Sequence, residues 1–172
     1  MACVRRIIAG VSDSPRCLPA LRCAADLAHA HDGVLFPVHA WVPSARSLAA
    51  HEYPSAELRQ AWEDAAWQRL WHALDAAFGG PQPGLQVQPV VVPGNPGRIL
   101  VRAASRADDL LVIGAGRRDA GRRRRGGTVS RYCLAYAGCP VIAVPPPALQ
   151  PAGSSARAGF RRSAGRGQTT HP

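Results

Sequence analysis

Short apolar runs alternate along this chain with longer segments whose apolar residues recur every three or four positions. The short runs predict β-strands over residues 4–11, 34–42, 85–92, 110–113 and 141–144. The longer segments predict helices over residues 15–31, 56–78, 96–104 and 129–137. Strands and helices that alternate in this order predict an α/β fold, with a parallel sheet covered by helices on both faces.

Capping residues sharpen the predicted helix starts. Ser14 and Asn95 are each followed by a proline, the arrangement expected for an N-cap and the first helical position. Ser55 is the predicted N-cap of the longest helix, and Thr128 that of the last. Pro37 lies inside the second predicted strand, where its missing N–H argues against a regular first half.

The longest predicted helix has one apolar face, which Trp67 and Trp71 widen. Tryptophans on a helix can stack with bases or ligands, but core packing against the sheet is the favoured interpretation. The face consists of Leu58, Trp62, Ala66, Leu70, Leu74 and Phe78.

The segment between the last two predicted strands contains the best candidate for a binding site. The fourth strand ends at Gly114, a loop of glycine and arginine follows, and Gly127 and Thr128 open the last helix. Free backbone N–H groups and the positive helix end, roughly half a charge, favour phosphate at such a junction. An ordinary turn between strand and helix is the alternative, since glycine-rich turns are common.

The 172 residues suffice for one domain with a substantial core, and no run of about 20 apolar residues is present to span a membrane. The net charge of +10 is unevenly distributed. Residues 117–125 contain six arginines and one aspartate, and residues 148–172 contain four arginines and no acid. The second of these segments lacks hydrophobic periodicity. We therefore expect a folded domain over residues 1–147 and a disordered basic tail over residues 148–172.

Three interpretations of the arginine-rich loop stay open. A solvated loop is the favoured one, and a loop that clamps phosphate is the second. The third is a salt-dependent contact with nucleic acid, shared with the basic tail. No recognition motif for nucleic acid accompanies the arginines, which places this interpretation last.

No residue pattern in the sequence supports a catalytic mechanism. The six histidines are dispersed, and the five cysteines lack the spacing of a metal site. His39, on the second predicted strand, is expected to pack rather than to catalyse. We therefore expect a protein that is not an enzyme, has no metal-binding residues and lies in a reducing cytoplasm.

Three stretches of the chain resemble the universal stress protein family. The family's first strand, aspartate turn and first helix are similar to IIAGVSDSPRCLPALRCAADLAHAHDGVL. Its third helix with the fourth strand, and its last strand, are similar to PGNPGRILVRAASRADDLLVIG and GCPVIAV. The resemblance covers about residues 3–147. It implies a five-stranded parallel sheet in the order 3-2-1-4-5, with a ligand crevice between the first and fourth strands.

Some members of this family bind ATP through the pattern Gly-x2-Gly-x9-Gly-Ser/Thr. Gly114, Gly127 and Thr128 match the first and the last two positions of that pattern. Arg117 stands at the second glycine, and Gly116 lies one residue earlier. An arginine side chain can fill the space left for phosphate, or it can bind the phosphate through charge-assisted hydrogen bonds.

The first turn also departs from the pattern of the ATP-binding members. Ser12 stands where those members have an aspartate that contacts the ribose. Serine keeps a hydroxyl but loses the charged acceptor. Asp13 can replace that aspartate only if the turn shifts.

The resemblance implies a non-catalytic stress-response protein that holds ATP, with Mg²⁺ as an accompanying ion, in the crevice. The implied ribose and adenine contacts are Gly10, Val11, Ser12 and Ala40. The implied phosphate contacts are Gly114, Gly116, Arg117, Gly127, Thr128 and Val129.

The resemblance also implies a homodimer paired through the last strand, whose apolar edge favours pairing. The residues of this implied interface are Val141, Ile142, Ala143 and Val144. A dimeric interaction protein without nucleotide binding is the alternative function, and a nucleic-acid-associated protein is a third.

Overall fold

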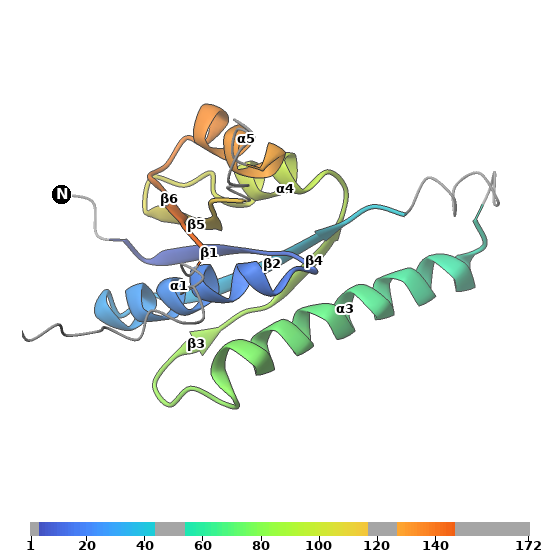
Figure 1. Ribbon diagram of the computed structural model, residues 1–172, viewed down its shortest axis with the longest axis horizontal. Helices are drawn as coiled ribbons and strands as arrows, with labels where there is room; N and C mark the ends of the chain where they lie inside the picture. Colours follow the sequence, from blue (N-terminus) through green and yellow to red (C-terminus); the bar gives the residue numbers. More distant parts are fainter. Residues whose placement is uncertain (1–3, 44–53, 117–126, 147–172) are drawn as a thin grey trace, which may run out of the picture.

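The computed structural model describes residues 4–43, 54–116 and 127–146, and Figure 1 shows their arrangement. The strands are β1 (Arg6–Val11), β2 (Val34–Trp41), β3 (Gln86–Val87), β4 (Val90–Pro93), β5 (Asp109–Gly114) and β6 (Val141–Val144). The α-helices are α1 (Leu18–Ala30), α3 (Ala56–Phe78), α4 (Pro96–Ala103) and α5 (Thr128–Tyr136). A short 3-10 helix, Pro15–Cys17, precedes α1.

The strands form one parallel sheet in the order β3-β2-β1-β5-β6, with β4 also paired to β2. The predicted α/β class and the order 3-2-1-4-5 are therefore confirmed. The predicted strand over residues 85–92 is divided into β3 and β4, which raises the number of strands to six.

The expectation that Pro37 disturbs the second strand is wrong, because β2 runs unbroken from Val34 to Trp41. Leu35 and Trp41 direct their carbonyl groups outward, toward Gln88 and Gly94. Pro37 is also an odd-numbered residue of β2, so its nitrogen, which carries no hydrogen, faces the same side. β3 pairs with Val34 and Leu35 and β4 begins opposite Val38, so the proline lies at the break between them.

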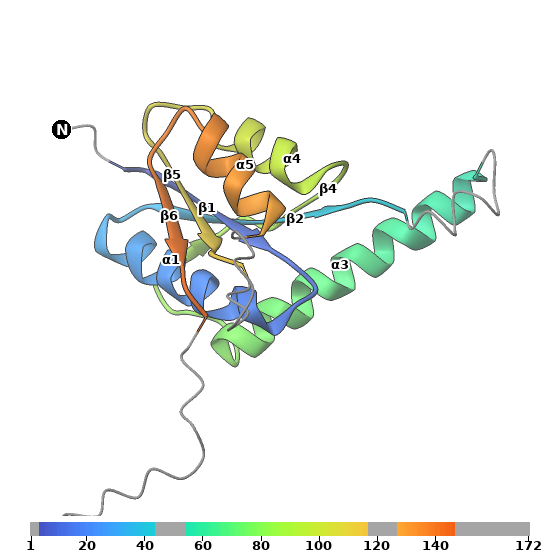
Figure 2. The ribbon, with the colours of Figure 1, turned by 45° about the horizontal axis from the view of Figure 1, so that its top comes forward.

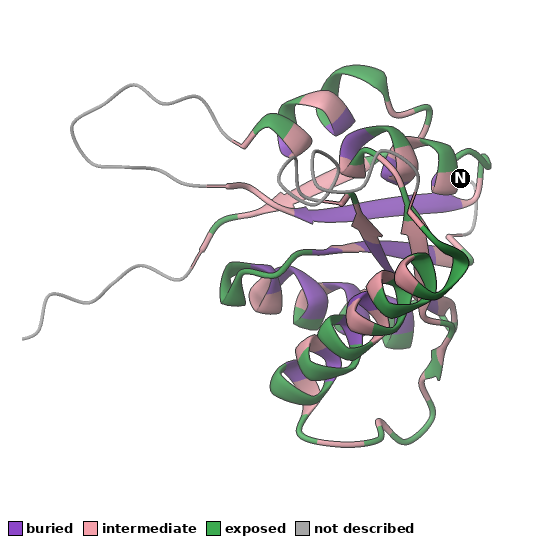
Figure 3. Cartoon of the chain, turned by 90° about the vertical axis from the view of Figure 1, so that its right-hand side faces the viewer, coloured by how far each residue is buried: buried purple, intermediate pink, exposed green. Residues whose placement is uncertain are grey.

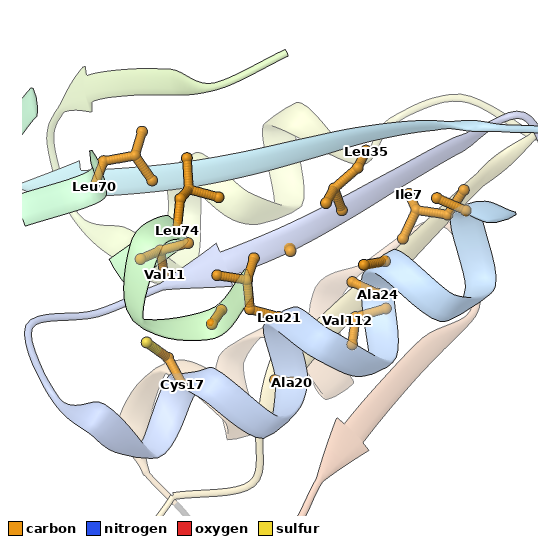
Figure 4. Packing of buried hydrophobic residues seen from close by; sticks show 14 of the residues in the cluster. Ile7, Val11, Cys17, Ala20, Leu21, Ala24, Leu35, Leu70, Leu74 and Val112 are labelled. Carbon is orange, nitrogen blue, oxygen red and sulfur yellow. The ribbon is translucent and has the colours of Figure 1, made fainter. Parts of the chain in front are cut away.

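Helices cover both faces of the sheet (Figure 1). On one face, α1 and α3 pack on alternate strand residues, and Ile7 and Leu35 point toward Leu21 and Ala24 of α1 (Figure 4). On the other face, α4 and α5 pack on the intervening residues, among them Ile8, Val38, Leu111 and Ile113. The buried positions follow the strands and the inner sides of the helices, as Figure 3 shows.

Two predicted helix starts differ in detail from the structure. Ser14 accepts a hydrogen bond from the N–H of Arg16, but it opens the 3-10 turn rather than α1 itself. The Oγ of Ser55 accepts from the N–H of Leu58 at 3.2 Å, as expected for the N-cap of α3. That helix ends at Gly79, whose φ of 69° lies in the left-handed region favoured by glycine.

A buried ion pair joins β1 to β5 at the amino edge of the sheet. The Nη1 atom of Arg6 lies 3.4 Å from Oδ1 of Asp109, whose side chain is fully buried. Oδ2 of Asp109 accepts from the N–H of Arg106, and the Arg6 guanidinium also donates to the carbonyl of Ala103 and covers the Phe36 ring. The buried carboxylate of Asp109 thus has a charged partner and a backbone hydrogen-bond donor.

Replacement of Arg6 by methionine should destabilise the protein by about 3 kcal/mol, because it leaves the Asp109 carboxylate buried without its counter-charge. Urea unfolding followed by circular dichroism measures the loss. Arg131→Met, at an exposed arginine of α5, is the matched control and should change stability by less than about 0.5 kcal/mol. Equal stability of the two variants would show that the pair is dispensable.

Candidate functional site

A pocket of about 830 Å³ opens at the carboxyl edge of the sheet. It lies where the chain leaves β1 toward α1 on one face and leaves β5 toward α5 on the other, which is the usual ligand position in open α/β sheets. The sequence-predicted site residues within the described ranges all line this pocket: Gly10, Val11, Ser12, Ala40, Gly114, Gly116, Gly127, Thr128 and Val129. Arg117 lies outside the described residues, as do the arginine-rich loop and the basic tail.

One end of the pocket is formed by the end of β5 and the start of α5. Gly116 has a φ of 78°, a left-handed conformation that favours glycine. A Cβ atom on Gly127 would lie 3.6 Å from the Cα of Gly116, so the two ends of the intervening loop meet here. Glycine at both positions therefore leaves backbone N–H groups open to a ligand.

Thr128 is not the N-cap of α5, contrary to the prediction. The N-cap is Gly127, whose backbone is extended and whose carbonyl accepts the first helical hydrogen bond, from Arg131 at 3.1 Å. Thr128 is thus the first helical residue. Because a glycine cap has no side chain to donate or accept, the amides of the first turn of α5 have no side-chain cap among the described residues.

Ser130 links this helix start to the sheet. Its side chain is buried, and its Oγ donates to the carbonyl of Gly114 at 2.9 Å. The bond fixes the first turn of α5 against the last residue of β5. The amide groups of that turn are therefore held in place before any ligand arrives.

Ionisable side chains from three segments of the chain meet at the middle of the pocket. The carboxylate of Asp13, in the turn after β1, lies 3.7 Å from Nε2 of His39 and 3.8 Å from Nε of Arg69. His39 is buried and its Nδ1 lies 3.2 Å from the carbonyl of Val11, so its ring is held by both neighbours. Asp13 and Arg69 are more than half exposed, and such pairs contribute at most about 1 kcal/mol. A ligand that displaces one of these weak contacts to reach the polar atoms of the cluster therefore loses little free energy.

The other end of the pocket is aromatic. Trp41, the last residue of β2, and Trp62, on α3, line it together and contact each other edge to face, with ring centroids 6.3 Å apart. The predicted role of the α3 face in the core is therefore only partly correct. Ala66, Leu70 and Leu74 are buried, but Trp62 is half-buried beside the pocket and Trp71 is 53% exposed.

Three of the described cysteines, Cys23, Cys133 and Cys139, do not favour thiolate chemistry. Burial, and then the neighbouring Cys139, raise the pKa of Cys133 to about 11. The pKa of Cys139 is raised by burial and by Asp109, and that of Cys23 by burial and by Asp26. These three thiols are protonated at neutral pH and are poor nucleophiles.

Among the residues that α3 contributes to the pocket, sequence reasoning missed Arg69 and favoured core packing over ligand contact for Trp62. Trp62 and Arg69 lie seven positions apart, two helical turns, and therefore on one face of the helix. That spacing is visible in the sequence. What the sequence does not show is that this face reaches past the end of β2, where the core stops and the pocket begins.

The model of the universal stress protein family matches residues 4–145 of this chain. The chain belongs to the universal stress protein family. No match was found among curated protein sequences. None of the described helices is both long and apolar enough to cross a membrane, and no group of three or more candidate metal ligands occurs among the described residues.

Solved structures of this family share the fold. The universal stress protein UspA of Lactobacillus plantarum is 21% identical, with a TM-score of 0.59 over 84% of this chain and 99% of that one. A universal stress protein solved in complex with cAMP is 24% identical, with a TM-score of 0.57 over 83% and 97% of the two chains. A universal stress protein of Archaeoglobus fulgidus is 19% identical, with a TM-score of 0.53 over 82% and 98%.

Replacement of Ser130 by alanine should lower the free energy of unfolding by about 1 kcal/mol, because it removes the hydrogen bond to Gly114 in a buried position. Urea denaturation measures the shift in midpoint at unchanged slope. Ser105→Ala, at an exposed serine after α4, is the control and should be neutral. A neutral Ser130→Ala would mean that the bond does not hold the start of α5.

Proposed function

We propose that this protein is a non-catalytic, cytoplasmic regulatory member of its family that binds ATP, with Mg²⁺ as an accompanying ion. One observation carries the proposal: a single pocket joins the open amides at the start of α5 to polar side chains and then to an aromatic wall. This sequence of surfaces suits the phosphates, ribose and base of a nucleotide. The described cysteines are free thiols, which agrees with a reducing compartment.

The phosphates would bind at the start of α5. Backbone amides of Gly127, Thr128 and Val129, the positive end of the helix dipole and the Thr128 hydroxyl would all favour their negative charge. Arg16 also lines the pocket, and its carbonyl lies 3.5 Å from the position of a Cβ on Gly114. Arg16 therefore lies beside the end of β5 and adds a cationic residue to the lining of the pocket.

The ribose would lie beside the turn after β1. Ser12 replaces the aspartate that ATP-binding members carry there, but Asp13 lines the same pocket and is oriented by His39 and Arg69. A carboxylate in this place can accept hydrogen bonds from both ribose hydroxyls. Asp13 is therefore the proposed acceptor, and Ser12 a supporting hydroxyl.

Adenine is the proposed base because one neighbour of the same fold was solved with cAMP. Gly10, Val11 and Ala40 line the part of the pocket between the turn and the aromatic wall.

Titration calorimetry with Mg-ATP tests this function on protein that is free of bound nucleotide. Saturable binding should weaken about tenfold in Thr128→Ala, because a hydrogen bond to a charged phosphate is lost. Ser105→Ala should bind as the unmodified protein does. Absence of both heat and thermal stabilisation at millimolar ATP would sink the proposal and favour the nucleotide-free interaction protein.

We also propose that two copies pair along β6, which is the edge strand of the described sheet. Pro140 and Val144 accept hydrogen bonds from Leu111 of β5 and from Ala115, the residue after this strand, so the residues of even number face β5. Val141 and Ala143 therefore direct their backbone N–H and C=O groups outward. An outward row of unpaired backbone groups is what a second strand needs.

Replacement of Ala143 by proline should convert a dimer to a monomer, because it removes an outward N–H without removing a bond between β5 and β6. Light scattering coupled to size-exclusion chromatography measures the mass. Ala143→Ser keeps the N–H and should stay dimeric. A proline variant that remains a dimer would place the interface elsewhere.

A further inference from the structure

The aromatic end of the pocket contains residues that the proposed phosphate and ribose contacts do not involve. Trp41 and Trp62 form its wall, together with Val42, Pro43 and Ala65. The edge-to-face contact of the two tryptophans occupies one ring face of the pair. Both residues still line the pocket, where a third flat group can pack against them.

Core packing alone does not account for Trp62. The fully buried residues of α3 begin at Ala66, and before it only Leu58, Trp62 and Ala65 are partly buried. The first half of α3 extends beyond the body of the sheet beside the end of β2, as Figures 1 and 2 both show. Trp62 therefore lies where the helix covers the pocket rather than the core.

Trp41 provides a second indication that a ligand binds at this end of the pocket. Its Nε1 atom is buried and has no hydrogen-bond acceptor among the described residues. Buried N–H donors are nearly always paired in folded proteins. A flat group that brings a ring nitrogen to this tryptophan could accept the bond.

The order of the strands fixes which part of a ligand reaches the tryptophans. Along the carboxyl edge, Gly114 ends β5, Val11 ends β1 in the middle, and Trp41 ends β2. A nucleotide whose phosphates lie at α5 and whose ribose lies at Asp13 must direct its base toward β2. The base is then the part that meets Trp62.

We propose that Trp62 is the stacking surface for the base, and that it determines how strongly this protein distinguishes a nucleotide from its phosphate part alone. The inference rests on the proposed nucleotide function. Stacking on an indole accepts any flat base, whereas the buried Trp41 N–H favours a base with an acceptor nitrogen at that edge. Adenine fulfils both requirements.

Two ligands separate base stacking from phosphate binding: Mg-ATP and magnesium tripolyphosphate, which has the same phosphates and no base. Trp62→Ala should weaken ATP about tenfold or more, the range seen when a stacking aromatic is removed, and should leave tripolyphosphate unchanged. Trp62→Phe, which keeps a ring, should recover most of the ATP affinity. Trp71→Ala is the matched control, because this tryptophan lies on the same helix, stacks on Trp67 and does not line the pocket.

Each outcome of these titrations is decisive. Unchanged ATP affinity in Trp62→Ala overturns the stacking role and leaves the nucleotide function intact. An equal loss of ATP and tripolyphosphate shows that Trp62 only supports the fold, which also overturns it. The stacking role is also overturned if the unmodified protein binds ATP no more tightly than it binds tripolyphosphate. No binding of either ligand overturns the proposed function and this inference together.

Fluorescence gives an independent readout, because the chain has four tryptophans. Trp67→Phe combined with Trp71→Phe leaves Trp41 and Trp62 as the emitters. ATP should quench this emission on binding, and tripolyphosphate should not. Quenching of equal size with both ligands would contradict direct contact between base and indole.

Discussion

The pairing of β1 with β5 is the constraint on which the rest of the structure depends. These strands are far apart in sequence, and the buried pair of Arg6 and Asp109 joins them at the amino edge. From β1 the chain crosses to one face of the sheet, and from β5 it crosses to the other. The two connections therefore diverge at the carboxyl edge and leave the pocket between them.

The site follows from this divergence and from a few local features. Gly116 and Gly127 bring the ends of the loop together, and Ser130 fixes α5 to the end of β5. The first turn of α5 thus points its amides into the space that the sheet leaves open. Binding that relies on backbone groups held in this way needs little reorganisation when a ligand arrives.

Hydrophobic periodicity was sufficient to predict the strands and the helices, because each element buries one regular face. The order of the strands in the sheet came from the resemblance to the family. Periodicity was not sufficient where the conformation of one residue depends on a neighbouring strand or residue. Pro37 looked like a defect in a strand, and only the break between β3 and β4 opposite it makes it compatible with the sheet. Thr128 looked like a cap, because serine and threonine usually are, but the extended backbone of Gly127 moves the helix start by one residue.

The candidate site shows the same division. Its glycine-lined end could be predicted, since glycine and helix-start patterns are local in sequence. The contributions of Trp62 and Arg69 could not, because both depend on where α3 crosses the carboxyl edge. The apolar stripe of α3 was correctly identified, yet periodicity alone cannot separate a face that meets the core from one that meets a pocket.

The same reasoning explains why a departure from the family pattern need not remove a function. Ser12 lacks the carboxylate of the ATP-binding members, but the adjacent Asp13 reaches the pocket and is oriented by His39 and Arg69. A ribose needs an acceptor at a position in space, and neighbouring residues in an exposed turn can both supply it. In this chain, Arg69 and Trp62 come from one face of α3, so a single helix both orients the proposed ribose acceptor and forms the proposed base wall.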